Sequence, residues 1–410
     1  MRTVRSREGM KEIRTQVAIA GAGPVGTVAA YCLASQGVDV VLLEEGADCA
    51  LDLRASTFHP PTLEMLDEFG ITRRLIEKGL KAPVYHFRER RTGEVIDFDM
   101  AEIADATRYP YRVQCEQYHL SRMLSELVRE QDGAEVLFGH RVAAIEQGPD
   151  EVTIHAEGPL SIMKITADYL IGADGANSTV RKWLGTEFHG FTYPEKFLCF
   201  TTTEPLEEHI SNLCHVNYVS DPAEWMVLLR VPSLWRVLVP ADMDTPDEEL
   251  LADAKKADVF DRLIGRGQEV ETHHRTIYRV HQRVAKSFLD GRVALIGDAA
   301  HLNNPIGGFG MNSGIHDAFN LAGRLVRVFG EGADADHELS AFERQRRTTT
   351  HEFIQAQTIR NMEYLKEGEG QLHARRKAEM EAIRADPEKR REFLLRQSMI
   401  ECVERERMAA

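Results

Sequence analysis

A glycine-rich turn near the N-terminus constrains the fold of this chain more than any other feature. The apolar segment 16–20 predicts a short buried strand, and the turn follows it directly as GAGPVG, residues 21–26. A helix is expected over about 24–36, and a second apolar strand over 38–43 leads to Glu44. This order of strand, turn, helix and strand is the context that a dinucleotide-binding unit requires.

The residues of the turn have separate physical tasks. Gly21 permits the tight turn, Gly23 lets the backbone approach a pyrophosphate, and Gly26 allows the helix to pack closely on the strand. Pro24 and Val25 open the helix, whose N-terminus offers unpaired N–H groups and a partial positive charge to phosphate. These five residues are therefore the candidate pyrophosphate site.

Glu44 follows Gly21 by 23 residues and ends the second predicted strand. An acid at this place can accept hydrogen bonds from the ribose hydroxyls of an adenosine. Its neighbour Glu45 is included in the same candidate site. The unit does not distinguish FAD from NAD, so the motifs further along the chain have to do so.

The second motif, residues 168–181, begins as a buried strand and ends as the first turn of a helix. Ser178 is the expected N-cap residue of that helix. Asp174 and Gly175 form a predicted sharp turn at the C-terminal end of the strand, where α/β sheets place ligands. Arg181 has the alternative interpretation of a surface arginine.

The third motif indicates FAD. A strand over 292–298 delivers Asp298 to its C-terminal end, where the carboxylate can accept a hydrogen bond from the ribityl chain of a flavin. A helix is expected from Met311 and Asn312 to Leu325, with its N-terminal dipole facing the flavin pyrimidine ring and stabilising negative charge there. The loop before the helix offers backbone N–H groups to the isoalloxazine ring, and its candidate residues are Pro305, Gly307, Gly308, Phe309 and Gly310.

The three motifs are GAGPVG at 21–26, GADGANSTVR at 172–181 and GDAAHLNNPIGGFGMNSGIHDAFNLAGRL at 297–325. In them the chain resembles the class A flavoprotein monooxygenases, the single-component FAD-dependent aromatic hydroxylases, over about residues 15–350. The resemblance implies the α/β two-domain fold of para-hydroxybenzoate hydroxylase, with a Rossmann-like FAD-binding domain, an inserted antiparallel β-sheet domain for the substrate, and C-terminal helices. The implied parts are a discontinuous FAD-binding domain at 15–80, 110–185 and 285–345, a substrate domain at 81–109 and 186–284, a helical segment at 346–410 and a flexible tail at 1–14.

The resemblance also assigns roles to single residues. Arg54 matches the family arginine that reaches the phosphate and ribityl region of the cofactor. Gln117 resembles the glutamine that contacts the flavin, with Gln114 as a close competitor, and Val142 falls where relatives contact adenine through the backbone. Ser56 stands where phenol hydroxylase relatives carry an aspartate, so a carboxylate base is missing there.

Alternating apolar and polar residues over 194–241 and 273–284 predict an antiparallel sheet between the flavin motifs. In the family that the chain resembles, such a sheet forms the floor of the substrate pocket. His59 and Tyr278 are the candidate catalytic bases, and a place in the core or on the sheet surface is the alternative for each. The candidate substrate residues are Tyr218, Trp225, Arg230, Trp235 and His274, with the same alternative.

The resemblance implies a reaction in which NAD(P)H reduces the FAD and O₂ adds to form a flavin C4a-hydroperoxide. That species hydroxylates an electron-rich ring, either phenol-like or N-heteroaromatic. One group of alternatives stays among flavoenzymes: an epoxidase, a ring-opening, tailoring or drug-modifying monooxygenase, or a reductase or oxidase on a non-aromatic substrate. A flavin-binding protein without catalytic activity is the remaining alternative.

Charge and cysteine usage exclude several other classes of partner. The net charge of −15 argues against nucleic acid or an anionic membrane surface, because both are polyanions. No apolar run is long enough to cross a bilayer. The 6 cysteines include no C-x-x-C pair, which predicts no metal site and no disulfide framework, and favours a cytoplasmic protein with reduced thiols. The charged segment beyond Glu363 carries an apolar stripe at Leu394, Leu395, Met399 and Ile400, for which a solvated helix, packing on the body and a homodimer contact are the alternatives.

Overall fold

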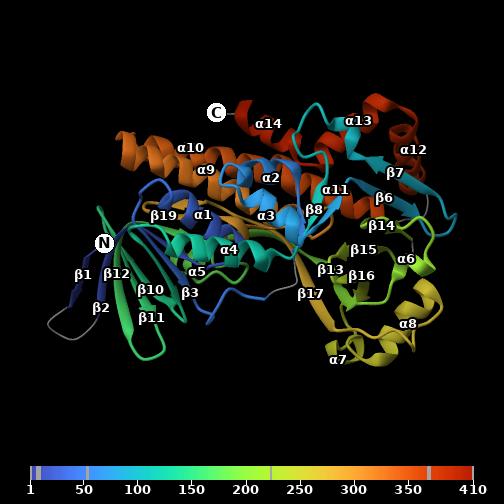
Figure 1. Ribbon diagram of the computed structural model, residues 1–410, viewed down its shortest axis with the longest axis horizontal. Helices are drawn as coiled ribbons and strands as arrows, with labels where there is room; N and C mark the ends of the chain where they lie inside the picture. Colours follow the sequence, from blue (N-terminus) through green and yellow to red (C-terminus); the bar gives the residue numbers. More distant parts are fainter. Residues whose placement is uncertain (1, 6–10, 52–54, 222–223, 367–370, 409–410) are drawn as a thin grey trace.

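Two large β-sheets form the body of the protein. The computed structural model describes residues 2–5, 11–51, 55–221, 224–366 and 371–408. In Figure 1 a nine-stranded sheet lies on the left and an eight-stranded sheet on the right, with long helices along the top. This is the mixed α/β architecture that the sequence predicts. Within the described residues, no helix combines the length and the apolar character needed to cross a membrane.

The nine-stranded sheet has a parallel core whose strands are buried on both faces. Residues 17–20 have exposed fractions of at most 2%, as expected for parallel strands covered on both sides. The parallel strands are β2 (Lys11–Ala20), β3 (Val40–Glu44), β9 (Ala134–Phe138), β12 (Ile162–Gly172) and β19 (Val293–Leu295). The antiparallel additions are β10 (Arg141–Gln147), β11 (Val152–Glu157) and β18 (Leu289–Asp290).

The N-terminal segment differs from the expected flexible tail. Strand β2 begins at Lys11, before the expected domain start at residue 15, and β1 (Arg2–Arg5) pairs with it in antiparallel register. The physical reason is that β12 is long enough to pair with β2 from Glu12 onward, which buries Ile13 to an exposed fraction of 2%.

Three helices cover the parallel strands next to the candidate phosphate turn. Helix α1 (Pro24–Ala34) connects β2 to β3 and packs against both α4 (Gln117–Arg129) and α9 (Phe309–Glu331). The predicted helices at 24–36 and from 311 to 325 are therefore present, and α9 begins two residues earlier and ends six residues later than expected. Short helices α5 (Thr179–Leu184) and η2 (Gly297–Ala299) follow the second and third motif strands.

The eight-stranded sheet confirms the predicted antiparallel insertion. Its strands are antiparallel except for the neighbours β14 and β6, which run parallel. In spatial order they are β20 (His301–Leu302), β17 (His274–Ala285), β13 (Phe188–Thr202), β16 (Leu234–Asp242), β15 (Met226–Val231), β14 (Val216–Ser220), β6 (Val84–Glu89) and β7 (Val95–Asp99). Strand β20 comes from the third motif, so the sheet reaches the candidate flavin loop.

Alternation along these strands gives the eight-stranded sheet two apolar faces. One face packs Phe200 and Trp235 against Phe260 of helix α8 (Asp253–Ile264). The other face packs Phe197 and Trp225 against Ile306 and against helix α11 (Ala356–Leu365). We call this second face the aromatic face; its residues from the strands, with Trp225 directly before β15, are Phe87, Tyr193, Phe197, Cys199, Tyr218, Trp225, Val227, Leu229, Leu238, Tyr278 and Val280.

Short elements connect the two sheets. Strand β8 (Arg112–Gln114) lies between β4 (Thr57–Phe58) and β5 (Leu80–Ala82) in a three-stranded sheet. Helices α2 (Pro60–Asp67) and α3 (Ile71–Lys78) run between β4 and β5. The remaining short helices are η1 (Met100–Ile103), α6 (Leu206–His209) and α7 (Asp247–Leu250).

The C-terminal helices pack on the body, so the prediction of a solvated helix for this segment is wrong. Leu394 and Met399 have exposed fractions of 1% and 0%, because they pack with residues of the eight-stranded sheet and of α9. The chain runs through α10 (Ala335–Thr349), a π-helical stretch at Thr350–Gln355, α11, α12 (Gln371–Ala385), α13 (Pro387–Gln397) and α14 (Ile400–Met408).

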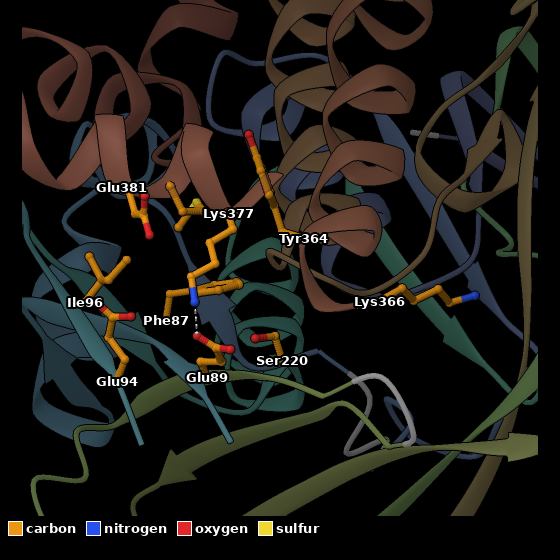
Figure 2. A pocket seen from close by; sticks show the side chains of 10 residues that line it. Phe87, Glu89, Glu94, Ile96, Ser220, Tyr364, Lys366, Lys377 and Glu381 are labelled. Atoms are coloured by element: carbon orange, nitrogen blue, oxygen red, sulfur yellow. Dashed lines mark hydrogen bonds and ion pairs between the residues drawn. The ribbon is translucent and has the colours of Figure 1, made fainter. Parts of the chain in front are cut away.

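A pocket lies where α12 and the end of α11 meet strands β6 and β7 (Figure 2). Lys377 reaches across it, with its Nζ atom 3.4 Å from Glu89 Oε2. An ion pair this exposed contributes roughly 0–1 kcal/mol, so burial of Met380 and Ile383 holds α12 in place more than charge does. The pocket is lined by Phe87, Glu89, Glu94, Ile96, Ser220, Tyr364, Lys366, Lys377, Met380 and Glu381, and none of these is a predicted site residue.

Candidate active site

The first glycine turn has the geometry that the motif predicts. Gly21 has φ +100°, and a Cβ atom there would lie 2.5 Å from Ala173 O, so a side chain is excluded. A Cβ on Gly26 would lie 1.9 Å from Gly21 O. A Cβ on Gly23 would meet no atom within 4 Å, so open space lies beside the start of α1. No side chain caps that helix, so its first N–H groups remain available to a phosphate.

Glu44 is held at the end of β3 by two backbone amides. Its Oε2 accepts from Ala22 N at 2.8 Å, and its Oε1 accepts from Gly46 N at 2.9 Å. A carboxylate has about four lone-pair sites, so acceptor capacity remains for a ribose. Glu45 points to the exposed side of the chain and stays a prediction.

The second motif is a capped turn against the first. Asp174 Oδ2 accepts from Thr179 N at 2.6 Å and from Val180 N at 3.0 Å. Ser178 Oγ accepts from Arg181 N at 2.9 Å, which confirms Ser178 as the N-cap of α5. The carboxylate of Asp174 therefore fixes the conformation of this turn, beside Gly21, through hydrogen bonds within the protein itself.

Arg181 is not the surface arginine of the alternative interpretation. Its exposed fraction is 7%, and its guanidinium stacks 3.9 Å from the ring centroid of Phe188. It donates to Ala299 O at 2.8 Å and to Ala176 O at 2.7 Å. Arg181 thus ties the second motif to the third, a role that the sequence spacing does not reveal.

A buried charge network supports the third motif. Asp317 on α9 accepts from Gly297 N at 3.0 Å and pairs with His301 at 2.7 Å and with Arg346 at 2.6 Å. Burial alone would raise the pKa of Asp317, but Arg346 and His301 outweigh it and hold the pKa at about 2. Asp298, directly after Gly297, is exposed at the carboxyl end of β19, where a ligand can reach its carboxylate.

The glycine loop and His59 form one hydrogen-bonded unit. Gly307 and Gly308 have φ of +100° and +74°, and Gly308 N-caps α9 without a side-chain bond. His59 Nε2 lies 2.8 Å from Gly307 O, and Asn312 Nδ2 donates to Gly308 O at 2.7 Å and to Thr57 O at 2.8 Å. The loop is therefore held from one side, and within it Gly308 N donates to Pro305 O at 3.0 Å and Ile306 N donates to Asn304 Oδ1 at 3.1 Å.

His59 is a hydrogen-bonding residue rather than a strong base. It is completely buried, and burial together with nearby Arg112 holds its pKa well below the usual range. Because Nε2 faces a carbonyl oxygen, that nitrogen carries the hydrogen and Nδ1 is an acceptor. Nδ1 has no hydrogen-bond partner among the described residues.

Phe309 and Met311 use their side chains for packing. Phe309 is completely buried with Phe353 and Met399, and its ring meets His59 edge-on at 5.4 Å. Met311 packs in the core of the nine-stranded sheet. Only their backbones, like those of Gly310 and the exposed Pro305, remain candidates for cofactor contact.

The two glutamine candidates differ in burial and in their contacts with the segment at residues 55–57. Gln114 is completely buried; its Oε1 accepts from Thr57 Oγ1 at 3.0 Å, and its Nε2 has no partner among the described residues. Gln117 begins α4, partly exposed, and its backbone N donates to Ala55 O. Val142 lies in β10, two residues after His140, whose N donates to Glu44 O.

The segment after Arg54 shows what replaces the missing carboxylate. Arg54 itself lies outside the described residues. Ser56 is buried, and its Oγ accepts from Arg236 Nη1 at 3.2 Å. Arg236 belongs to β16 and is buried to an exposed fraction of 4%, so a cation from the substrate sheet reaches the FAD-binding segment here.

Two of the substrate candidates, Trp225 and Tyr218, and the catalytic candidate Tyr278 lie on the aromatic face. Trp225 has an exposed fraction of 3% and meets Phe197 edge-on at 4.8 Å. Tyr218 and Tyr278 are partly buried against the same cluster, which includes Ile306 of the flavin loop. These side chains therefore stand between the sheet and the candidate flavin site.

Trp235, Arg230 and His274 do not lie there, which corrects the sequence analysis. Trp235 faces the opposite side of the sheet, and its Nε1 donates to Glu207 Oε2 at 2.6 Å. Arg230 is directly opposite Trp235 in the register and stacks on its ring at 5.6 Å. His274 is exposed at the start of β17. Alternation within a strand decides the face, and the sequence pattern alone did not fix which residues point to the flavin.

Two residues that the sequence motifs do not single out contact the glycine loop or the aromatic face. Asn304 is completely buried, accepts from Ile306 N at 3.1 Å and donates to Tyr193 Oη at 3.0 Å. Arg112 on β8 is 1% exposed and donates to Tyr218 Oη at 3.2 Å. The sequence offers one signal for Arg112: it is a charged residue directly before the apolar Val113 in a short strand.

Cys115, Glu116 and His119 are of ligand-forming types, and their candidate ligand atoms lie within 4.8 Å of one another. Burial, followed by the charge of Glu116, raises the pKa of Cys115 to about 12.

These observations fit FAD. Open space and uncapped N–H groups lie at Gly23, and Glu44 keeps acceptor capacity for a ribose. Asp298 presents an exposed carboxylate, and the uncapped N-terminus of α9 lies behind Gly308. The donor and acceptor types match the pyrophosphate, the sugar hydroxyls and the flavin ring in the order in which the molecule would span them.

Comparison with known proteins agrees with the geometry. Residues 14–357 match the family model described as FAD binding domain. The chain is 32% identical to para-nitrophenol 4-monooxygenase of Pseudomonas sp. (strain WBC-3) over 384 residues, which is 92% of this chain and 94% of the relative. It is 33% identical to 6-hydroxy-3-succinoylpyridine 3-monooxygenase HspB of Pseudomonas putida over 364 residues, 87% of this chain and 91% of the relative.

Solved structures show the same fold. The structure of p-nitrophenol 4-monooxygenase PnpA from Pseudomonas putida DLL-E4 aligns with a TM-score of 0.88 and 32% identity over 94% of this chain and 98% of that one. The anhydrotetracycline hydroxylase OxyS from Streptomyces rimosus aligns with a TM-score of 0.78 and 28% identity over 94% of this chain and 76% of that one. With the three motifs in place and the aromatic face set against the glycine loop, the chain belongs to the class A FAD-dependent aromatic hydroxylases, the flavoprotein monooxygenases with the fold of para-hydroxybenzoate hydroxylase.

Proposed function

We propose that this protein uses NAD(P)H and O₂ to add one hydroxyl group to a phenol-like or N-heteroaromatic ring. The observation that carries the proposal is the contact between the flavin loop and the aromatic face. Ile306 of the loop packs with Phe197 and Trp225 of the sheet, next to Gly307 and Gly308. A ring bound on this face lies beside a flavin that contacts the loop.

The relatives support the same class of substrate. The names of two relatives specify para-nitrophenol and 6-hydroxy-3-succinoylpyridine as their substrates. Each of these compounds carries a hydroxyl group on an aromatic ring together with a second substituent that contains oxygen. We extend the shared part, a hydroxylated aromatic ring, to the substrate of this chain.

The residues that would hold FAD follow from the site. The pyrophosphate would lie at Gly23 and the N-terminus of α1, the ribose at Glu44, the ribityl chain at Asp298, and the flavin ring at the loop with Gly307 and Gly308. When bound, FAD supplies the redox chemistry: it takes up hydride from NAD(P)H and activates O₂.

The chain itself would perform three tasks. The N-terminus of α9 stabilises negative charge next to the glycine loop. The aromatic face excludes water from the ring that reacts. His59 Nδ1, an acceptor without a partner among the described residues, accepts a hydrogen bond from a substrate hydroxyl, while Nε2 donates to Gly307 O and keeps it in place.

The test measures NAD(P)H oxidation by the FAD-loaded protein with a panel of phenols, hydroxybenzoates, hydroxypyridines and quinolones. Formation of H₂O₂ and product mass are followed in parallel, under ¹⁸O₂. We expect at least one ring compound to accelerate oxidation and to gain one labelled oxygen atom. Acceleration with H₂O₂ alone would identify a ligand that fits without reacting. If no aromatic compound gains oxygen, the proposed reaction is wrong.

A further inference from the structure

Arg112 is a buried cation without a counter-charge. Its exposed fraction is 1%, and among the residues that the structure describes no carboxylate lies within ion-pair distance of its guanidinium. Its partners are Tyr218 Oη at 3.2 Å, Gln397 O at 3.3 Å and the ring of Tyr85, whose centroid lies 4.3 Å from Cζ. Its Nε has no partner within the described parts of the chain. Burying an unpaired charge is expensive, so an arginine in such a place calls for an explanation.

Other polar atoms around Arg112 also lack partners. Gln114 points to the same side of β8 as Arg112, because residues two apart in a strand share a face, and its Nε2 is unsatisfied among the described residues. The same holds for Tyr85 Oη, whose ring centroid lies 4.3 Å from Arg112 Cζ, and for His59 Nδ1. Buried polar atoms are nearly always hydrogen-bonded in proteins, so orphans that gather at one place indicate a site for a polar ligand.

This group lies next to the flavin loop. Gln397, which accepts from Arg112, donates through Nε2 to Asn361 Oδ1 at 2.6 Å, and Asn361 donates to Ile306 O at 3.3 Å. Tyr218 belongs to the aromatic face, and His59 bonds Gly307 O. Arg112 is therefore connected by a short chain of hydrogen bonds to the loop that would contact the flavin ring.

We propose that Arg112 and the Tyr218 hydroxyl form an anion subsite that binds a negatively charged oxygen substituent of the aromatic substrate. A guanidinium in a dry site is suited to two oxygens of a nitro or carboxylate group, or to a phenolate oxygen, through charge-assisted hydrogen bonds. These three groups share one property: each is a ring substituent with an oxygen atom that carries full or partial negative charge. This inference rests on the proposed function and narrows its substrate class.

The charge of the whole chain makes the subsite more selective. With a net charge of −15, the protein surface repels anions in general, so an anionic aromatic compound needs a local cation to bind. Arg236, which is buried on β16 and donates to Ser56 Oγ, adds a second cation between the eight-stranded sheet and the segment after Arg54. The subsite itself is defined by Arg112, because Arg112 contacts Tyr218 directly.

The test measures dissociation constants of the FAD-loaded protein by calorimetry at one pH and one salt concentration. The ligands are 4-nitrophenolate, 4-hydroxybenzoate and the uncharged 4-methylphenol, which separate the oxygen groups from the ring. We expect the wild type to bind at least one of the two anions about 10- to 100-fold more tightly than 4-methylphenol, the range of one charge-assisted hydrogen bond or two. Arg112→Met should remove this preference and leave binding of 4-methylphenol unchanged.

Three further variants sharpen the result. Arg112→Lys keeps the charge but loses the two-pronged geometry, so it should retain part of the preference. Tyr218→Phe removes one hydroxyl and should weaken anion binding less than Arg112→Met does. The matched control is Arg108→Met, because Arg108 is four residues away, exposed, and paired with Asp67 at 3.0 Å. It removes the same charge and should change nothing.

Stability separates a ligand site from a structural role. Replacing a buried cation that lacks a carboxylate partner by an apolar side chain is often neutral or stabilising, so Arg112→Met should melt at the wild-type temperature or above. An Arg112→Met variant that keeps the wild-type preference for the anions overturns the inference. If the wild type hydroxylates neutral and anionic rings equally well, the proposed function stands and this inference fails. If anion binding depends on Arg112 but no oxygen is incorporated, the subsite stands and the proposed function fails.

Discussion

Single residues decide whether the glycine turn can accept a phosphate. Gly21 and Gly37 both have positive φ, +100° and +79°. They differ in their surroundings, because a Cβ on Gly21 would meet Ala173 O at 2.5 Å whereas a Cβ on Gly37 would meet nothing within 4 Å. The first residue is therefore constrained by both conformation and space, and the second by conformation alone.

We expect Gly21→Ala to lose most FAD binding and to lower the free energy of unfolding by more than Gly37→Ala does. A side chain at residue 21 must push apart the turns of the first and second motifs. Gly37→Ala is the matched control: it should lower stability by roughly 1–2 kcal/mol, the cost of a left-handed alanine, with unchanged FAD affinity. Flavin fluorescence titration and denaturant unfolding measure the two quantities. Equal FAD affinity in both variants would contradict the role given to Gly21.

Sequence motifs identified most of these residues, but only where a glycine or a helix cap gives a local sequence pattern. Gly21, Ser178 and Gly308 could be assigned from short patterns, because their conformations are determined by neighbours in sequence. Arg112 and Asn304 could not be assigned, since their partners Tyr218 and Tyr193 lie 106 and 111 residues away in the chain. Trp235 was assigned to the wrong face, because strand alternation gives two faces and does not say which one meets the flavin.

At the scale of elements, three helices meet at one buried charge network. Asp317 on α9 binds Arg346 on α10, and Arg346 pairs with Glu406 on α14. Asp317 also accepts from Gly297 N, so the network reaches the residue before Asp298. Helix α10 thus places a guanidinium against the motif loop.

The network makes stability depend on acid pH. The folded-state pKa of Asp317 is about 2, below the ordinary aspartate value of 3.8. A depressed pKa stabilises the folded state above the unfolded-state value, and this stabilisation is lost as pH falls toward the folded value. We expect Asp317→Asn to be less stable than the wild type at pH 6, by about 2 kcal/mol or more.

Urea unfolding of both proteins at several pH values measures this difference. It should shrink steadily as pH falls from about 5 toward 2, because the wild type then protonates the same carboxyl group. Ser121→Ala on α4, whose hydroxyl donates to the backbone oxygen of Gln117, is a control that should show no such narrowing. A difference between wild type and Asp317→Asn that is independent of pH would show that Asp317 is not the titrating group.

At the scale of the whole molecule, both ends of the chain support one site. Helix α1, which follows the motif turn, packs on α9, and α9 packs on α10, which contacts α14. Met399 and Cys402 cover Phe309 at the start of α9, and Glu406 completes the partners of Arg346. The glycine loop is thus packed from behind by residues almost 100 positions further along the chain.

We expect a chain that ends at Ser398 to bind FAD more weakly and to unfold more readily. Removal of α14 uncovers Phe309 and takes one of two carboxylates from the buried Arg346, which should lower the free energy of unfolding by about 3–5 kcal/mol. Full-length Glu406→Gln separates the two causes, since it keeps the apolar cover and loses the charge. A chain ending at Met408 is the control for truncation itself. Wild-type stability and FAD affinity in the chain that ends at Ser398 would contradict the role of α14.

The sequence by itself determined the class of fold and the cofactor, because glycine turns, helix caps and strand periodicity act over a few residues and leave the same pattern wherever they occur. It also determined that an antiparallel sheet lies between the flavin motifs. Only the tertiary structure decided which face of that sheet meets the glycine loop, that Arg181 and Arg346 are buried, and that Arg112 lies beside Tyr218. Those outcomes depend on contacts between segments far apart in the chain, and the free energy of burying a charge is set by neighbours that no local pattern specifies.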